Sequence, residues 1–416
     1  MNWYKNFDWI TAFIWLALSS IGLVAIYSAT QGPVSQFLPE YIQNNFYKQL
    51  VWITISIIIV ISLQFTAPRT FSQISYFFYG FFLLITIYTL FFGVEINGAK
   101  SWIDVFGFRY QVSETMKVGT ILAVANYLSN RRNIQSERLD SALFAALLII
   151  VPGVLVLMQN DTGTALVLFS LIPFMLFWSG LPYGISLFII SPAIIGYFTI
   201  LDLMWGTIAA IVISIVIFFV QKRPWLTVVS VVTNVVIIGG INFAVNSLLQ
   251  PHQKARIVAF ANPSFDPQGV GWNVIQAKTA IGSGGLTGKG FLEGTQTQLK
   301  FLPEQWTDFI FCVIGEEFGF LGAGLVIVLF MILLLNLISG AGSHKNPFAQ
   351  SVLVGIVSIY LIHLLINTGS AMGLLPVIGL PLPFVSYGGS AFLSNSLMIG
   401  IALNLLMYKR ESTIFT

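Results

Sequence analysis

The chain has 416 residues, of which 56% are hydrophobic and only 8% are charged, and its formal net charge is +3. Soluble globular domains carry about 25% charged residues, so this composition excludes a soluble fold and indicates a protein of the lipid bilayer. The lysine and arginine residues do not cluster as nucleic-acid recognition requires, so no nucleic-acid partner is expected.

Apolar runs of about 20 residues recur from end to end and predict an all-α polytopic membrane fold, with residues 1–416 forming one integral-membrane domain. The first run, from Trp9 to Ser28, is long enough to span and lacks a processing site, so no cleavable signal peptide is expected. We predict twelve spans, over residues 8–30, 47–66, 73–93, 112–129, 140–158, 163–179, 182–200, 203–221, 225–249, 309–337, 350–371 and 387–408.

Lysine and arginine in short loops favour the cytoplasmic side of a membrane. With the N-terminus inside, the outer short loops hold only Lys48, Lys100 and Arg109. We therefore expect both termini in the cytoplasm and the 250–308 loop outside. The cations assigned to the inner side are Lys5, Arg69, Arg131, Arg132, Arg138, Lys222, Arg223, Lys345, Lys409 and Arg410.

Three stretches are expected not to span. Residues 94–111 alternate aromatic and polar side chains and are expected in the outer interface, where tryptophan and tyrosine are enriched. Residues 250–308 are too polar to cross a bilayer. Residues 373–386 carry three prolines, which predicts a non-helical loop at membrane level whose backbone must be satisfied by protein or water.

The stretch from Phe301 to Phe320 places Asp308 between a polar loop and an apolar helix, with Glu316 and Glu317 further along that helix. An ionisable group near hydrocarbon costs about 2.5–3.5 kcal/mol on insertion scales, which favours a functional role. The alternative is that Thr307 or Asp308 caps the helix start. Taken alone, Asp308 fits both interpretations.

Glu114 and Lys117 lie three residues apart at the start of the 112–129 helix, so they share a face and can pair. The alternative is an interfacial ion pair in which Lys117 extends outward. Because Asp308 enters from the same predicted side, we favour a polar cavity, open to the outside, that these three residues line.

The segment AIGSGGLTGKGF, residues 280–291, resembles a phosphate-binding loop but fails the Walker A spacing at Ser283 and Gly290. It could form a backbone anion site or a plain turn cluster. Four nearby cations favour an anion, although outer-loop cations also contact lipid phosphates non-specifically. They are Lys254, Arg256, Lys278 and Lys289.

The remaining reactive side chains predict structural roles. His252, His344 and His363 are too scattered for a nucleophilic triad or a zinc site, and His363 is expected to hydrogen-bond between helices. Asp161 is expected to cap the 163–179 helix. Cys312, the single cysteine, excludes a disulfide framework. The residues alone therefore indicate an enzyme or a carrier acting on a lipid-linked anion.

At these residues the chain closely resembles the SEDS family of cell-wall polymerases (FtsW, RodA and SpoVE), and its RodA branch more than its FtsW branch. The resemblance covers nearly the whole chain. The matching segments are SETMK (113–117), QNDTGTALVL (159–168), the run from QKARIV to TGKGF (253–291), GTQTQLKFLPEQWTDFIFCVIGEEFGFLG (294–322) and NTGSAMGLLPVIGLPLPFVSYGGS (367–390).

The resemblance implies a peptidoglycan glycosyltransferase that polymerises lipid II at the outer face of the bacterial cytoplasmic membrane, in cell-wall elongation and cell-shape maintenance. It implies a class B penicillin-binding protein and other elongation-complex membrane proteins as partners. It assigns the catalytic role to Asp308 and a supporting role to Glu114 and Lys117. For the substrate diphosphate, the candidate groups are Arg256, Lys278 and Lys289, with Mg²⁺ or Mn²⁺ as a candidate cofactor.

Three features depart from the family pattern. The family usually has ten spans, and the 182–249 region here is expected to contain an added helix pair. Trp306 stands where relatives commonly have histidine, and Val112 stands where proline usually precedes the SE pair. None of these departures removes a proposed catalytic residue.

Two other functions use the same residues: a lipid II flippase or lipid-linked carrier, and a division-specific FtsW-type polymerase. A carrier needs polar groups that reach from both sides, whereas the charges here gather on one predicted side, which favours surface chemistry. A scaffold that only recruits a transpeptidase would leave the buried acids without a role.

Overall fold

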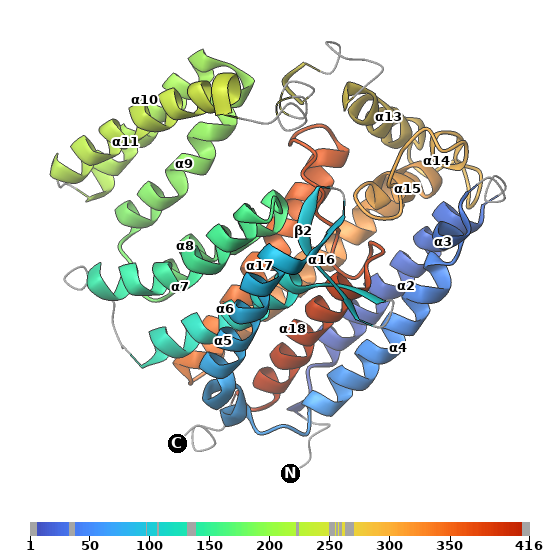
Figure 1. Ribbon diagram of the computed structural model, residues 1–416, viewed down its shortest axis with the longest axis horizontal. Helices are drawn as coiled ribbons and strands as arrows, with labels where there is room; N and C mark the ends of the chain where they lie inside the picture. The colour runs from blue at the N-terminus through green and yellow to red at the C-terminus, as the bar shows by residue number, and fades with distance from the viewer. Residues whose placement is uncertain are drawn as a thin grey trace.

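The computed structural model describes residues 6–32, 38–96, 98–105, 108–130, 139–221, 224–248, 254, 257, 260–262 and 270–409. Arg256, one of the predicted diphosphate-binding residues, lies outside them. The described chain is a bundle of long helices with one small sheet (Figure 1).

Each predicted span falls on one main helix except 309–337, which falls on two. Ten of the described helices are long and apolar enough to cross a membrane, so the multi-pass prediction is confirmed. Of the other two, α8 is shorter and α6 is more polar. The helices are α2 (Trp9–Gln31), α4 (Asn45–Leu63, preceded by the short α3, Glu40–Gln43), α5 (Pro68–Phe92), α6 (Val112–Ser129), α7 (Leu139–Met158), α8 (Thr162–Trp178), α9 (Tyr183–Leu201), α10 (Leu203–Gln221), α11 (Pro224–Phe243, followed by a π-helical turn, Ala244–Leu248), α16 (Gly319–Ser343), α17 (Pro347–Ala371) and α18 (Gly389–Met407).

Helices α6, α17 and α18 form the centre of the bundle. Of the residues in an 18-residue apolar stretch of each helix, 72% are buried in α17 and 89% in α18, against 17–44% in the other candidate spans. In α6 all but two of the 18 residues are buried, including Glu114 and Lys117. Charged side chains within a membrane protein are tolerated when they face the protein interior. The central position of α6 therefore keeps its charges away from lipid.

Residues 94–111, predicted as a non-spanning stretch, form a three-stranded antiparallel sheet between α5 and α6. The alternation of aromatic and polar side chains in this stretch has the two-residue period of a strand. The backbone N–H of Lys100 donates to the carbonyl of Gln159 at 2.8 Å, which anchors the sheet to the end of α7. The strands are β1 (Val94–Ile96), β2 (Ala99–Val105) and β3 (Phe108–Gln111).

The predicted 309–337 span is divided into α15 (Ile310–Glu317) and α16. The break lies at Gly319, whose φ of +64° falls in the left-handed region that residues other than glycine rarely adopt. The single predicted span passes through Glu316 and Glu317, two acids directly before the break, and the break itself depends on contacts with the distant residues Leu286 and Gly288. Ahead of α15, the polar region contains α13 (Val270–Ser283) and the short α14 (Thr295–Gln298), and both pack against α15 (Figure 1).

Residues 373–388 connect α17 to α18 without a helix, as the prolines predict. Within this loop the N–H of Leu382 donates to Oγ of Ser386 at 2.8 Å. The N–H of Tyr387 donates to the carbonyl of Trp306 at 2.9 Å. Non-helical backbone at membrane depth requires partners of this kind from the protein itself.

Helices α9, α10 and α11 lie to one side of the bundle (Figure 1). They share a second apolar cluster, and none of the described residues of α10 or α11 belongs to the main one. Ile185 of α9 packs against both clusters. Helix α9 therefore links the three-helix group to the bundle.

We expect Gly319→Ala to destabilise the protein. A Cβ there would lie 2.3 Å from the N atom of Gly288 and 2.7 Å from the carbonyl carbon of Leu286, and the left-handed backbone alone costs about 1–2 kcal/mol for other residues. The thermal unfolding midpoint in detergent measures the effect. Gly324→Ala is the matched control in α16: its Cβ meets nothing within 4 Å, so its midpoint should stay or rise. Equal midpoints for both variants would contradict the role given to Gly319.

Candidate functional site

Asp308 lies half-buried in the turn that leads into α15. The N-cap of α15 is Phe309, without a side-chain cap, so the alternative in which Thr307 or Asp308 caps this helix is wrong. The backbone carbonyl of Asp308 accepts a hydrogen bond at 3.0 Å from Nδ2 of Asn367 on α17. The backbone of this residue is therefore tied to the central helix α17.

Glu114 and Lys117 form the predicted ion pair, with Nζ 2.8 Å from Oε2. The alternative in which Lys117 extends outward is wrong, because its side chain is 0% exposed. Nζ of Lys117 also lies 3.1 Å from Nε2 of His363 on α17. Nδ1 of His363 lies 2.9 Å from the carbonyl oxygen of Pro381. The prediction that His363 hydrogen-bonds between helices is confirmed.

The segment 379–381 of the loop lies next to both parts of the site. A Cβ on Gly379 would be 3.6 Å from Oδ2 of Asp308, so the carboxylate lies beside this glycine. The carbonyl of Leu380 accepts from Nδ2 of Asn367 at 2.9 Å, and the carbonyl of Pro381 faces His363. The structure thus brings Asp308 and the Glu114–Lys117 pair to one loop, while a water-filled cavity shared by them stays a prediction.

Asp161 caps α8, as predicted: its Oδ1 accepts the N–H of Thr164 at 3.1 Å. Its Oδ2 accepts from Nε2 of Gln111 at 2.8 Å and from Oγ of Ser113 at 2.9 Å. The same carboxylate therefore fixes the end of the sheet and the start of α6, directly before Glu114.

Glu316 lies in α15, before the span of α16, and bonds to the protein. Its two oxygens accept the N–H groups of Thr295, Gln296 and Thr297, each at 2.9 Å. The ammonium of Lys289 lies 2.7 Å from Oε1. Burial favours the neutral acid, but Lys289 and the backbone donors outweigh it, so the pKa of Glu316 lies below its ordinary value. Glu316 therefore holds the segment that contains α14.

Glu317, the neighbouring acid, has the opposite shift. Its Oε1 accepts from Oγ of Ser28 at 2.5 Å and from Nε2 of Gln298 at 2.8 Å. Burial raises the pKa of Glu317, and the charge of Glu316 adds to the increase. Through these contacts Glu317 ties α15 and the α14 segment to α2, so both acids have structural partners.

The glycine-rich segment closes the end of α15. The N–H groups of Lys289 and Gly290 donate to the carbonyls of Glu316 and Glu317 at 3.0 and 3.1 Å. Carbonyls at the end of a helix lack partners within the helix and need such donors. These amides are consequently engaged within the protein, which favours the turn-cluster alternative over an anion site.

The two described lysines predicted to bind diphosphate differ in their surroundings. Lys289 bonds to Glu316 and, at 2.6 Å, to Oγ1 of Thr295. Lys278 is exposed on α13, and a Cβ on Gly373 would lie 2.7 Å from its Nζ, which places this ammonium at the beginning of the 373–388 loop. The diphosphate role of Lys278, Lys289 and Arg256 stays a prediction.

Within the described ranges, no group of three or more His, Cys, Asp or Glu side chains is arranged to hold a metal ion. Of the two site carboxylates, Glu114 already pairs with Lys117. Mg²⁺ is commonly held by one or two carboxylates together with substrate phosphates. The described side chains therefore form no complete site by themselves, and the divalent cation stays a prediction.

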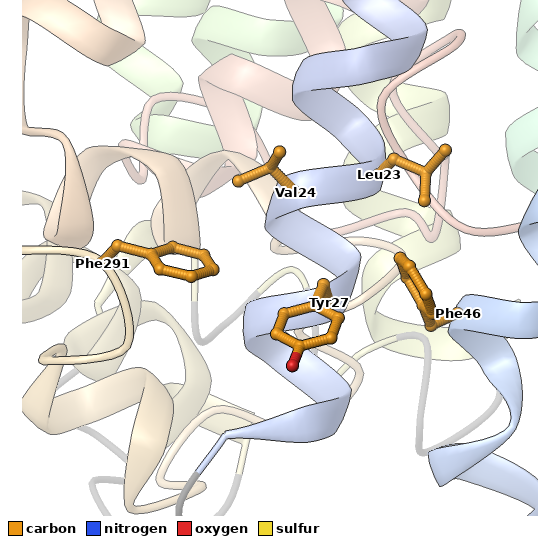
Figure 2. A pocket seen from close by; sticks show the side chains of 5 residues that line it. All are labelled: Leu23, Val24, Tyr27, Phe46 and Phe291. Atoms are coloured by element: carbon orange, nitrogen blue, oxygen red, sulfur yellow. The ribbon is translucent and has the colours of Figure 1, made fainter.

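Two apolar grooves of the described chain are lined by none of the predicted site residues. One, with a volume of about 320 Å³, lies beside α2 and is bordered by the side chains shown in Figure 2. The other, about 540 Å³, lies between α10 and α11. Both grooves are lined almost entirely by apolar surface, which suits a hydrocarbon chain better than a reaction that requires polar groups. The first groove is lined by Leu23, Val24, Tyr27, Phe46 and Phe291.

Sequence reasoning missed Asn367 and gave His363 only a general role. The available signal was their spacing: two polar residues four apart in an apolar helix lie on one face. The partners of that face, Lys117 and the 379–381 carbonyls, lie far away in sequence or in an irregular loop, and spacing does not reveal them.

We expect Glu316→Gln to lower the free energy of unfolding by on the order of 3 kcal/mol at neutral pH, as for one member lost from a buried ion pair. Because the folded pKa of Glu316 is below its ordinary value, this stabilisation is present above pH of about 4.3 and is lost as the pH falls through the folded pKa. Thermal unfolding at several pH values should show the wild-type advantage shrinking in acid.

The matched control for this experiment is Glu293→Gln, an exposed acid in the same segment. It should leave the unfolding midpoint unchanged. A Glu316→Gln protein as stable as the wild type at pH 7 would contradict the stabilising role given to the contacts of Glu316.

Comparisons with known proteins agree with this architecture. The family model named for FtsW, RodA and SpoVE, described as a cell cycle protein, matches residues 8–209 and 198–411. The chain is 31% identical to peptidoglycan glycosyltransferase RodA of Treponema pallidum, with 96% of this chain and 98% of that protein covered. It is 30% identical to peptidoglycan glycosyltransferase MrdB of Escherichia coli, with 87% and 86% covered.

The fold is also similar to a solved structure that concerns the coordination of polymerization and crosslinking by a peptidoglycan synthase complex. The TM-score is 0.74 at 25% identity, with 98% of this chain and 99% of that chain covered. The family match covers both halves of the chain and all of the predicted site. The chain belongs to the FtsW/RodA/SpoVE family.

Proposed function

We propose that this protein is a peptidoglycan glycosyltransferase of the RodA type, which polymerises lipid II into glycan strands during cell-wall elongation. Relatives named RodA and MrdB carry this activity in their names. The observation that carries the proposal is the position of the Asp308 carboxylate beside Gly379. Gly379 belongs to the 373–388 loop, which also contacts His363, and His363 in turn contacts Lys117 of the Glu114–Lys117 pair. One irregular loop thus lies beside Asp308 and, through His363, is connected to the buried charge pair.

The reaction proposed is an inverting glycosyl transfer. Asp308, as a carboxylate, takes the proton of the GlcNAc 4-hydroxyl of the acceptor while that oxygen bonds to C1 of the donor MurNAc. The bond from C1 to the phosphate oxygen breaks, and undecaprenyl diphosphate leaves with the bonding electrons. General-base assistance of this kind contributes about 10²–10⁴-fold.

The leaving diphosphate gains negative charge, which cations near the loop would stabilise. Lys278 is exposed next to Gly373, and Arg256 belongs to the same polar region of the sequence. Lys117 is enclosed by Glu114 and His363, so it acts as a buried charge and as a support for the loop. Mg²⁺ or Mn²⁺, the candidate cofactor, would supply further positive charge at the diphosphate.

The proposed location is the bacterial inner membrane, with both termini in the cytoplasm and the site facing outward. The structure is compatible with this topology in one respect: the start of α2 and the last turns of α16 lie at the same end, where Nδ2 of Asn336 donates to Oδ2 of Asp8 at 2.6 Å. A class B penicillin-binding protein is the proposed partner for crosslinking, with other elongation-complex membrane proteins. The similarity to a chain of a peptidoglycan synthase complex supports that partner.

A lipid II flippase or carrier remains the alternative of another class, and a division-specific FtsW-type polymerase the alternative within the family. An assay of the purified protein with labelled lipid II, with and without the partner, separates a polymerase from a carrier. Glycan strands indicate a polymerase, and transfer across the membrane without polymer indicates a carrier.

We expect Asp308→Asn to abolish lipid II polymerisation, with a loss of about 10²-fold or more, because the amide has a similar shape but cannot accept the proton. Polymer length and rate from labelled lipid II measure it. Asp202→Asn is the control, because this exposed acid only caps α10 through the N–H of Met204, and asparagine also caps. Near-normal polymerisation by Asp308→Asn would remove the base from the mechanism.

We expect Glu114→Ala to reduce polymerisation, because it leaves the Lys117 ammonium buried without its counter-ion, a change that costs about 3–5 kcal/mol. The initial rate per folded enzyme and the unfolding midpoint should both fall. Glu114→Gln should lose less, since it keeps an acceptor for Lys117. If Glu114→Ala polymerises lipid II at the wild-type rate, the Glu114–Lys117 pair has no part in the reaction.

A further inference from the structure

Two side chains on one face of α17 contact two consecutive residues of the 373–388 loop. His363 and Asn367 are four residues apart and therefore lie on one side of the helix. Asn367 donates to the carbonyl of Leu380 at 2.9 Å, and His363 lies 2.9 Å from the carbonyl oxygen of Pro381. Both side chains are buried, and α17 is thus the element that fixes the backbone of the loop.

The same two side chains also reach the two halves of the proposed site. Asn367 donates to the backbone carbonyl of Asp308 at 3.0 Å. His363 Nε2 lies 3.1 Å from Nζ of Lys117, which in turn lies 2.8 Å from Oε2 of Glu114. A continuous chain of polar contacts therefore runs from Glu114 through Lys117 and His363 to the loop.

The partners of His363 determine which of its nitrogens carries the proton. An ammonium group has donors only, so Nε2 must present its lone pair to Lys117. A carbonyl oxygen has acceptors only, so Nδ1 must carry the hydrogen towards Pro381. The ring is consequently neutral and protonated at Nδ1, since a hydrogen on Nε2 would point at the ammonium.

We propose that His363, held as the neutral Nδ1–H imidazole between Lys117 and Pro381, is a positioning residue that couples the buried Glu114–Lys117 pair to the loop beside Asp308. This inference rests on the proposed glycosyltransferase function for its kinetic consequence. His363 touches neither sugar nor diphosphate in this role. It fixes the loop residue two positions after Gly379, the glycine beside the Asp308 carboxylate.

The coupling has a direct consequence for the reaction. A general base must lie within hydrogen-bond reach of the proton it removes, and displacement of a reacting group by about 1 Å can cost about 10²-fold in rate. Loss of the His363 contacts frees the carbonyl of Pro381 and removes the second partner of Lys117. The loop next to Asp308 then lacks the constraint that α6 supplies through α17.

The first test reads the ring itself and needs no substrate. The chain has three histidines, so ¹⁵N-histidine labelling of the full-length protein in lipid gives few signals, and the signal that disappears in His363→Gln is assigned to His363. At neutral pH we expect the shifts of a neutral ring with the proton on Nδ1, and a change in those shifts in Lys117→Met. A doubly protonated ring, or a neutral ring with the proton on Nε2, would overturn the proposal.

The second test is kinetic and uses three variants of the full chain with labelled lipid II. His363→Phe keeps the volume but removes both polar contacts, and we expect kcat to fall by about 10- to 10²-fold with little change in KM. His363→Gln carries one donor and one acceptor and should recover most of kcat. Ser358→Ala is the control, because this buried hydroxyl on α17 bonds only to Gly355 of its own helix.

The outcomes are distinguishable. A wild-type protein that makes no glycan from lipid II refutes the proposed function, and the ¹⁵N result still decides the state of His363. An active wild type whose kcat is unchanged in His363→Phe refutes the positioning role. A loss of kcat that His363→Gln does not recover, or that follows only a lowered unfolding midpoint, also overturns it and leaves His363 as a packing residue.

Discussion

The hydrocarbon core of a membrane holds no water, so each polar backbone group at that depth needs a partner within the protein. The 373–388 loop is irregular backbone, and its residues 379–386, next to Asp308, have partners on two sides. Asn367 and His363 of α17 face its carbonyls from one side. From the other, Oγ of Ser386 donates to the carbonyl of Thr307 at 2.6 Å. The contacts that make the loop tolerable are therefore the contacts that place Asp308.

Two buried carboxylates of the described chain are compensated by a lysine. Glu114 meets Lys117 within one turn of α6, and Glu316 meets Lys289 and a row of backbone donors. A buried charge without a partner is strongly unfavourable, whereas a hydrogen-bonded pair is tolerated. Position distinguishes the two pairs: the first contacts the loop beside Asp308 through His363, and the second organises the segment ahead of α15.

The helices, the cap at Asp161 and the non-helical 373–386 loop follow from the sequence, because hydropathy, capping residues and prolines act over a few neighbouring positions. The three-stranded sheet had a usable signal in the two-residue alternation of 94–111, which was interpreted only as interfacial. The break at Gly319 and the hydrogen bonds and ion pair of Glu316 were missed because they depend on the segment 288–297, which folds back on α15. The resemblance named Asp308, and only the fold shows that α17 holds it.

The three-helix group α9–α11 buries side chains around a core of its own. Its apolar cluster, which includes Ile195, Ile213 and Leu226, is separate from the main one. The buried apolar side chains described in α10 and α11 belong to this second cluster and not to the one that contains α6, α17 and α18. Amino-acid changes confined to the apolar cluster of α10 and α11 are therefore buffered from the helices around Asp308, so these two parts of the chain can drift in sequence independently.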